Sequence, residues 1–272
     1  MTSSLRLHVV VPVTGMGARD SAALAAGLGP GVAVTWSRIE TGPASIESEL
    51  DEALAAPDTI AKVLDAARSG AAAVVIDCLG DPGLEAAREV VTIPVLGSGQ
   101  TSMHVAAMLG YRFSILTVLS RLIRVDEEKA ARCGLASRLA SVRSVDIPVL
   151  ELEQDHERLT EALAEQGLRA VRDDGAHVII LGCTGMLGLA DSVAAALAAA
   201  GAPGIPVVDP LPATLQVAAG LARLGLAPSR RTYPPPPAKD RPGYGAVFGP
   251  VSSPVGPVSS PVGLAVSADV GA

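Results

Sequence analysis

Short apolar runs alternate along this chain with stretches in which apolar residues recur every three or four positions. The runs are rich in Val, Ile and Leu, a composition typical of strands that are buried on both faces of a parallel sheet. They predict strands at residues 7–11, 32–36, 72–77, 94–96, 112–118, 141–147, 177–181 and 207–208. The intervening stretches, such as 60–67 and 159–170, have helical spacing. This alternation predicts an α/β fold with parallel sheets that are covered by helices on both faces.

The succession of a strand, a cysteine, a helix and an Ile-Pro-Val strand occurs twice. The first copy reads VVIDCLG at 74–80 and IPVLG at 93–97, and the second reads VIILGCTG at 178–185 and IPVVD at 205–209. Internal repetition of this kind predicts two pseudo-symmetric α/β domains that face each other across a cleft. The expected domains are residues 1–97 with 210–227, and residues 98–209.

The last part of the chain, residues 228–272, has a different composition. It contains consecutive prolines at 234–237, and the sequence GPVSSPV occurs at 249–255 and again at 256–262. Segments rich in Pro, Gly and Ser bury too little apolar surface to offset the entropy that ordering costs. We therefore expect a disordered tail without a catalytic role.

The most informative residues are Cys78 and Cys183, one in each copy of the repeat. Each lies at the carboxyl end of a predicted strand, where open α/β sheets place their ligand sites. A single cysteine in an apolar segment is ordinarily a small core residue. Two cysteines at equivalent strand ends, each close to a glycine, favour a functional role instead. Cys133 has no comparable setting, and we interpret it as structural.

The turns after the two cysteines contain Gly80 and Gly185, which allow a substrate to approach the backbone closely. Free backbone N–H groups in such turns favour a thiolate. We therefore expect the pKa of both thiols to be lowered from the ordinary value of about 8.5. Asp81 precedes Pro82, and this pair is typical of a helix N-terminus. We expect Asp81 to cap a helix that begins at Pro82.

Other uses of the two thiols are disfavoured by the sequence. His177 begins the strand that ends near Cys183, so about 20 Å separates them, too far for a Cys–His nucleophile pair. The spacings of zinc ligands, of dinucleotide-binding glycines and of a phosphate-binding loop are absent, so we expect no metal and no cofactor. Two-base proton transfer remains. In this reaction a thiolate removes a proton from a carbon next to a carbonyl, and a thiol returns one to the opposite face.

Composition and charge narrow the class of partner. The chain has 272 residues, a formal net charge of −7 and 2% aromatic residues. An acidic chain without a cluster of Lys or Arg has no electrostatic reason to bind nucleic acid. No apolar stretch reaches the length of a membrane span, the N-terminus lacks the shape of a signal peptide, and three cysteines make no disulfide framework. We expect a soluble cytoplasmic protein with reduced thiols that binds a small molecule.

The segments DCLGDPGL at 77–84 and LGCTGM at 181–186 resemble the two signature motifs of the aspartate/glutamate/hydantoin racemase superfamily, in particular its hydantoin and allantoin racemase branch. The resemblance extends over residues 7–226. It implies an isomerase that works without a cofactor, with the active site in the cleft between two pseudo-symmetric halves. It also implies that Cys78 and Cys183 act as acid and base in the inversion of an α-carbon. Relatives are often oligomers, so a homo-oligomer is left open, although no segment locates an interface.

Departures from the family pattern indicate the substrate. The amino-acid racemases of the superfamily have Cys-Asn-Thr and Cys-Thr-His motifs, whereas this chain has CLG at 78–80 and CTG at 183–185. The groups that hold a free amino acid are therefore missing, and the resemblance implies a neutral cyclic amide. A 5-substituted hydantoin or ureide and a cyclic dipeptide (a 2,5-diketopiperazine) both fit. Many hydantoin racemases read Asn-Pro-Asn-Thr where this chain reads VPVT at 11–14, which favours a more apolar ring.

Polar residues at predicted strand ends are the candidates for binding the ring. They are Thr14, Ser98, Gln100, Thr117 and Asp209, together with Thr184, Gly80 and Gly185 beside the cysteines. Capping of the backbone is the competing explanation for Thr117 and Asp209. Two other classes of function stay open. One is decarboxylation of a malonate-type acid or cis–trans isomerisation of a small diacid on the same scaffold, and the other is small-molecule binding without catalysis.

Overall fold

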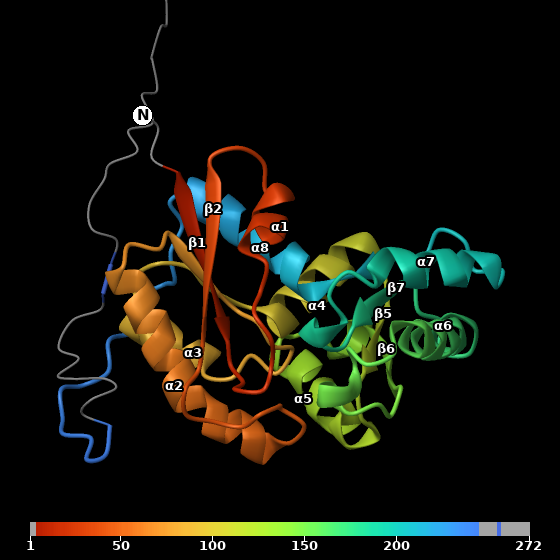
Figure 1. Ribbon diagram of the computed structural model, residues 1–272, viewed down its shortest axis with the longest axis horizontal. Helices are drawn as coiled ribbons and strands as arrows, with labels where there is room; N and C mark the ends of the chain where they lie inside the picture. The colour runs from red at the N-terminus through yellow and green to blue at the C-terminus, as the bar shows by residue number, and fades with distance from the viewer. Residues whose placement is uncertain (1–3, 245–254, 257–272) are drawn as a thin grey trace, which may run out of the picture.

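The molecule is built on two separate β-sheets, and the strands within each sheet are parallel (Figure 1). The computed structural model describes residues 4–244 and 255–256. Within these residues each sheet has four strands, in the orders β2-β1-β3-β4 and β6-β5-β7-β8. The strands are β1 (Leu5–Val11), β2 (Val32–Arg38), β3 (Ala73–Ile76), β4 (Val95–Gly97), β5 (Phe113–Thr117), β6 (Leu139–Ser144), β7 (Val178–Leu181) and β8 (Val207–Val208). The predicted strands and their parallel pairing are confirmed, with small differences at the strand ends.

Helices cover both faces of each sheet, as the alternating pattern predicts. The α-helices are α1 (Ser21–Ala26), α2 (Glu49–Arg68), α3 (Leu84–Val90), α4 (Ser98–Leu109), α5 (Ile123–Arg132), α6 (His156–Arg172), α7 (Ala190–Ala199) and α8 (Pro210–Arg223). Short 3-10 helices are η1 (Ser120–Leu122), η2 (Ala136–Arg138), η3 (Val149–Glu151) and η4 (Thr184–Met186). On the first sheet, α2 and α3 pack against one face and α1 and α8 against the other. On the second sheet, α6 and α7 cover one face and α4 and α5 the other.

The two sheets have the same internal order, so the repeat in the sequence corresponds to a repeat in the structure. We call the part built on β1–β4 the first half and the part built on β5–β8 the second half. β3 and β7 hold the equivalent inner position in their sheets. Because β3 ends at Ile76 and β7 at Leu181, Cys78 and Cys183 each come two residues after a strand. Both cysteines therefore lie beyond the carboxyl edge of a parallel sheet, where such folds bind ligands.

Residues 228–244 contain neither a helix nor a strand, as the composition of the tail predicts. They nevertheless contact the first half, because the Arg230 guanidinium donates to the carbonyls of Arg88, Glu89 and Val91 at the C-terminal end of α3. Carbonyls at a helix C-terminus lack partners within the helix, so Arg230 caps α3. The remainder of the predicted tail, 245–254 and 257–272, lies outside the described residues. Within the part of the chain that is described, no helix is long and apolar enough to cross a membrane.

Candidate active site

The turns that follow β3 and β7 present their cysteines in the same way. The backbone N–H of Gly80 donates to the Cys78 sulfur at 3.4 Å, and that of Gly185 donates to the Cys183 sulfur at 3.3 Å. Both cysteines are free thiols in partly exposed residues. Hydrogen bonds from backbone N–H groups stabilise a thiolate, so each turn is arranged to hold a charged sulfur.

Burial acts on the thiols in the opposite direction from these hydrogen bonds. It raises the pKa of Cys78 well above the ordinary value, and the negative charges of Glu52 and Cys183 raise it further. Burial also raises the pKa of Cys183, to about 11, against the lowering effect of the Gly185 N–H. The expectation that both thiols have a lowered pKa is therefore wrong. The motifs reveal the N–H donors, whereas the loss of water around the sulfur atoms depends on packing that no local motif encodes.

The two thiols also affect each other. The negative charge of Cys183 is one of the causes that raise the pKa of Cys78. Once one sulfur is ionised, its charge disfavours ionisation of the other. The pair therefore disfavours two thiolates at once, and the state with one thiolate and one thiol is the one that a two-base proton transfer requires.

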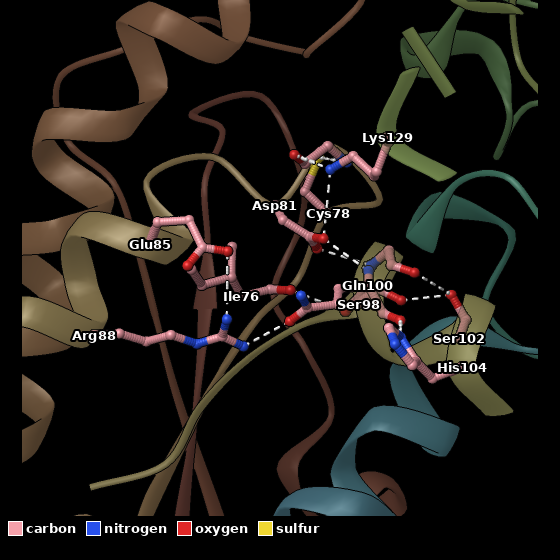
Figure 2. Close-up of polar contacts among 12 residues, drawn as sticks. Ile76, Cys78, Asp81, Glu85, Arg88, Ser98, Gln100, Ser102, His104 and Lys129 are labelled. Atoms are coloured by element: carbon pink, nitrogen blue, oxygen red, sulfur yellow. Dashed lines mark hydrogen bonds and ion pairs between the residues drawn. The ribbon is translucent and has the colours of Figure 1, made fainter. Parts of the chain in front are cut away.

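A buried lysine contacts the turn after Cys78 (Figure 2). Lys129 on α5 is 4% exposed, and its ammonium group donates to the Gly80 carbonyl and forms an ion pair with Asp81 at 3.4 Å. Glu52 on α2 is the nearby anion that raises the pKa of Cys78, and burial raises the pKa of Glu52 itself. Lys129 lowers the pKa of Cys78, so Lys129 and Glu52 have opposite effects on the pKa of this thiol.

Asp81 connects this turn to the N-terminus of α4. Its carboxylate accepts the N–H groups of Gly99 at 2.8 Å and Gln100 at 2.7 Å, both in the first turn of that helix. The expected cap is corrected here, because α3 begins at Leu84 with Gly83 at its N-cap. The Asp-Pro pair marks a helix start nearby in the sequence, but the free N–H groups within reach of the carboxylate belong to α4.

An arginine performs a similar role at the turn after Cys183. Arg19, in the loop after β1, donates its Nε to Asp77 at 2.7 Å and its Nη2 to the Thr184 carbonyl at 3.4 Å. Thr184 donates its Oγ1 to the Asp77 carbonyl at 3.1 Å. Because Asp77 directly precedes Cys78, these contacts join the segment of one cysteine to that of the other.

Comparison with known proteins identifies the family of the chain. The sequence profile described as Asp/Glu/Hydantoin racemase matches residues 18–218. The chain belongs to this family. A hydantoin racemase of Pseudomonas sp. (strain NS671) is 40% identical over 209 residues, which are 76% of this chain and 82% of that protein. A hydantoin racemase of Paenarthrobacter aurescens is 34% identical over 239 residues, 86% of this chain and 99% of the relative.

A solved structure agrees with these sequence matches. The allantoin racemase from Klebsiella pneumoniae superposes with a TM-score of 0.82 at 32% identity, over 90% of this chain and 99% of that chain. The family that the two cysteine motifs predict is therefore confirmed, together with the α/β fold and the isomerase class of this racemase family.

Three of the predicted binding residues in this racemase-family chain have protein partners for their side chains. Ser98 is fully buried and donates to the Ile76 carbonyl at 2.9 Å. The Gln100 side-chain oxygen accepts from Arg88 at 2.7 Å, as Figure 2 shows. Thr184 donates to the Asp77 carbonyl, as described above. These contacts explain the three residues structurally, and their part in binding a substrate stays a prediction.

The other predicted binding residues differ in their surroundings. Thr14 donates to the Pro43 carbonyl at 3.2 Å and lines a cavity of about 530 Å³ beside β2. The Asp209 carboxylate accepts the Gly188 N–H at 2.7 Å, which fits the capping explanation. The buried Thr117 hydroxyl lies beside the Asp126 carboxylate, whose pKa it lowers, and its part in binding a substrate stays a prediction.

Several residues of the site escape the sequence analysis. They are Arg19, Glu52, Asp126 and Lys129, none of which lies next to a cysteine motif. Asp126 is 5% exposed, and burial raises its pKa to about 7. Its charge raises the pKa of Cys183, and Lys129 lowers the pKa of Asp126. The available signal is their spacing on α5. Asp126 and Lys129 are three positions apart, so both lie on the buried face of the helix, beside Val125 and Ala130.

Proposed function

We propose that the protein is a cofactor-independent racemase of a 5-substituted hydantoin or a related cyclic ureide, with Cys78 and Cys183 as its two acid–base groups. The observation that carries the proposal is the pair of thiols held in equivalent turns, each with one N–H donor, where the charge of Cys183 raises the pKa of Cys78. The relatives named above support the choice of ring, since their names describe hydantoin and allantoin racemases.

The chemistry balances without any further reactant. The thiolate of one cysteine removes the proton from C5 of the ring, and the electron pair moves into the adjacent carbonyl to give an enolate. The thiol of the other cysteine then delivers its proton to the opposite face of C5, and the carbonyl reforms. The configuration is inverted, and the two sulfurs have exchanged their protonation states. Conversion of the opposite enantiomer, or proton exchange with water, restores the first state.

The raised pKa values suit this reaction. A carbon acid next to an amide carbonyl is weakly acidic, and a thiolate with a higher pKa is a stronger base toward it. The cost is a smaller thiolate fraction at neutral pH. Leu79, Gly80 and Gly185 beside the thiols offer no charged group for an α-ammonium or α-carboxylate, which supports a neutral ring over a free amino acid.

The test uses enantiopure substrates in D₂O. An enantiopure 5-alkylhydantoin, allantoin and a cyclic dipeptide are each incubated with the enzyme, and optical rotation and ¹H NMR are followed against an enzyme-free sample. We expect rapid loss of rotation for a five-membered ring, with one deuterium incorporated at the inverted carbon. Faster turnover of the cyclic dipeptide assigns the enzyme to the six-membered ring. Carbon dioxide release from a malonate, isomerisation of a diacid, or binding without turnover overturns the racemase proposal.

Substitution of the two cysteines tests their roles. Cys78→Ser and Cys183→Ser each replace a thiol with a hydroxyl that is a far weaker acid, so we expect the racemisation rate to fall by about 10³-fold or more in each. Cys133→Ser is the matched control, because Cys133 is expected to be structural, and it retains the wild-type rate. Racemisation at the wild-type rate in either active-site variant contradicts the mechanism.

A further inference from the structure

Each cysteine turn is held by a basic residue that comes from the other half of the molecule. For Cys78, in the first half, this residue is Lys129 on α5, which packs on the second sheet. Its ammonium group donates to the carbonyl of Gly80, the residue whose N–H donates to the Cys78 sulfur. The ion pair with Asp81, whose side chain is 6% exposed, fixes the ammonium group in this place (Figure 2). Lys129 therefore holds the turn that aims an N–H at the sulfur.

For Cys183, in the second half, the corresponding residue is Arg19 from the first half. Its guanidinium donates to the carbonyl of Thr184 at 3.4 Å. This carbonyl and the N–H of Gly185 belong to one peptide unit, so a contact on the carbonyl orients the N–H that donates to the Cys183 sulfur at 3.3 Å. The ion pair with Asp77 at 2.7 Å fixes the guanidinium, and both side chains are buried.

We infer that Lys129 and Arg19 are positioning residues, each serving one thiol, with Lys129 setting proton transfer at Cys78 and Arg19 setting proton transfer at Cys183. The inference rests on the proposed function. Its physical basis is that each cation holds one turn and contributes a positive charge near one sulfur. The two cations pair with different carboxylates, Lys129 with Asp81 and Arg19 with Asp77. Asp77 directly precedes Cys78, but the carbonyl that Arg19 holds belongs to the turn after Cys183.

The two assignments can be separated experimentally despite a thermodynamic restriction. The equilibrium constant of a racemisation is one, so kcat/KM must be equal for the two enantiomers in every variant. Deuterium exchange without inversion has no such restriction. When the acid on the far face is slow, the thiol that took up the substrate proton has time to exchange it with D₂O. It then returns a deuteron to the same face of the enolate, and deuterium enters with retention of configuration. The ratio of exchange to inversion therefore reports, for each enantiomer, on the cysteine that acts as the acid.

The experiment measures this ratio for both enantiomers in D₂O by NMR and chiral chromatography. Cys78→Ser first identifies the enantiomer whose ratio depends on Cys78 as the acid. We expect Lys129→Met to raise the ratio at least about threefold for that same enantiomer, and Arg19→Met to raise it for the opposite one, because a displaced acid slows its proton transfer. Arg124→Met is the control, because Arg124 is an exposed cation on α5 that pairs only with Glu49 and Glu128 among the described residues.

The conservative variants Lys129→Arg and Arg19→Lys keep the charge and are measured in parallel, so the test stands even where a methionine variant folds poorly. Recovery of the wild-type ratio in these variants, or a smaller rise for the same enantiomer, supports the assignment. The assignment is overturned if the Lys129 variants and the Arg19 variants raise the ratio of exchange to inversion for the same enantiomer. It is also overturned if an active variant shows no rise in this ratio. A wild-type enzyme that neither inverts nor exchanges the substrates overturns the proposed function, and the assignment with it.

Discussion

At the scale of single residues, the raised pKa values of the thiols determine how activity depends on pH. Burial raises the pKa of Cys183 to about 11 and that of Cys78 well above its ordinary value. Below these values, the fraction of enzyme that carries a thiolate increases about tenfold for each pH unit. We therefore expect kcat/KM to rise between about pH 7 and about pH 9 with a logarithmic slope close to unity. Polarimetry with subtraction of the buffer-catalysed rate measures the slope, and a plateau near neutral pH contradicts the raised values.

The cysteines and the donors beside them are predictable from the sequence, because the residues that define each turn are neighbours in the chain. Lys129 and Arg19 are not predictable in this way. Lys129 acts on a carbonyl 49 positions away and Arg19 on one 165 positions away. The thiol pKa values depend on the same distant packing, so a motif alone gives the sign of the hydrogen-bond effect and misses the larger effect of burial.

At the scale of elements, Asp81 caps α4 and pairs with Lys129 on α5, so it stabilises two helices at once. Asp81→Ala removes the acceptor of two helix N–H groups and leaves Lys129 as a buried cation without its partner. We expect the free energy of unfolding to fall by about 3 kcal/mol or more. Asp81→Asn keeps an amide oxygen for the N–H groups and tolerates the backbone φ of 53° at this position, so its cost is smaller.

Urea unfolding followed by far-UV circular dichroism measures these costs. Asp155→Ala is the matched control, because Asp155 is an exposed N-cap of α6 that accepts the Arg158 N–H at 2.9 Å and forms no ion pair with another described residue. Its loss is expected to cost about 1 kcal/mol. Equal losses in Asp81→Ala and Asp155→Ala show that the buried lysine does not depend on Asp81.

The strands are predicted from the sequence more completely than the contacts between elements. Runs of β-branched residues encode burial on both faces locally, so β1–β8 are found at their expected places. The partner of a cap is different, because it depends on which N–H groups the fold brings within reach. Asp81 and Arg230 illustrate this, because Asp81 caps α4 and Arg230 caps α3, and neither residue is close in sequence to the helix that it caps.

At the scale of the whole molecule, both apolar and polar contacts join the two halves. Leu79 of the first half is buried in an apolar cluster of the second half, and Leu187 of the second half packs against a cluster of the first. The apolar clusters lie on the two faces of each sheet. Between the halves, Glu47 accepts the Val149 N–H at 2.7 Å, and Arg19 joins Asp77 to the Thr184 carbonyl. Since the proposed acid–base chemistry needs both cysteines at once, these contacts would couple the packing of the two halves to the geometry of the site.

The ion pair of Arg19 and Asp77 gives this coupling a measurable pH dependence. Arg19→Met leaves the fully buried Asp77 carboxylate without its partner, so we expect a loss of about 3–5 kcal/mol near pH 8. Burial already raises the folded-state pKa of Asp77, while Arg19 lowers it, so the substitution raises it further. A carboxyl whose pKa is higher in the folded state favours folding at low pH and loses that contribution as the pH rises. The stability gap between variant and wild type should therefore be small near pH 5 and grow toward pH 8.

Urea titrations measure this gap, followed by the fluorescence of Trp36 in the first half and by far-UV circular dichroism. Arg124→Met is the control and is expected to stay within about 0.5 kcal/mol of wild type. A gap that is the same at both pH values means that Arg19 does not act through the Asp77 charge.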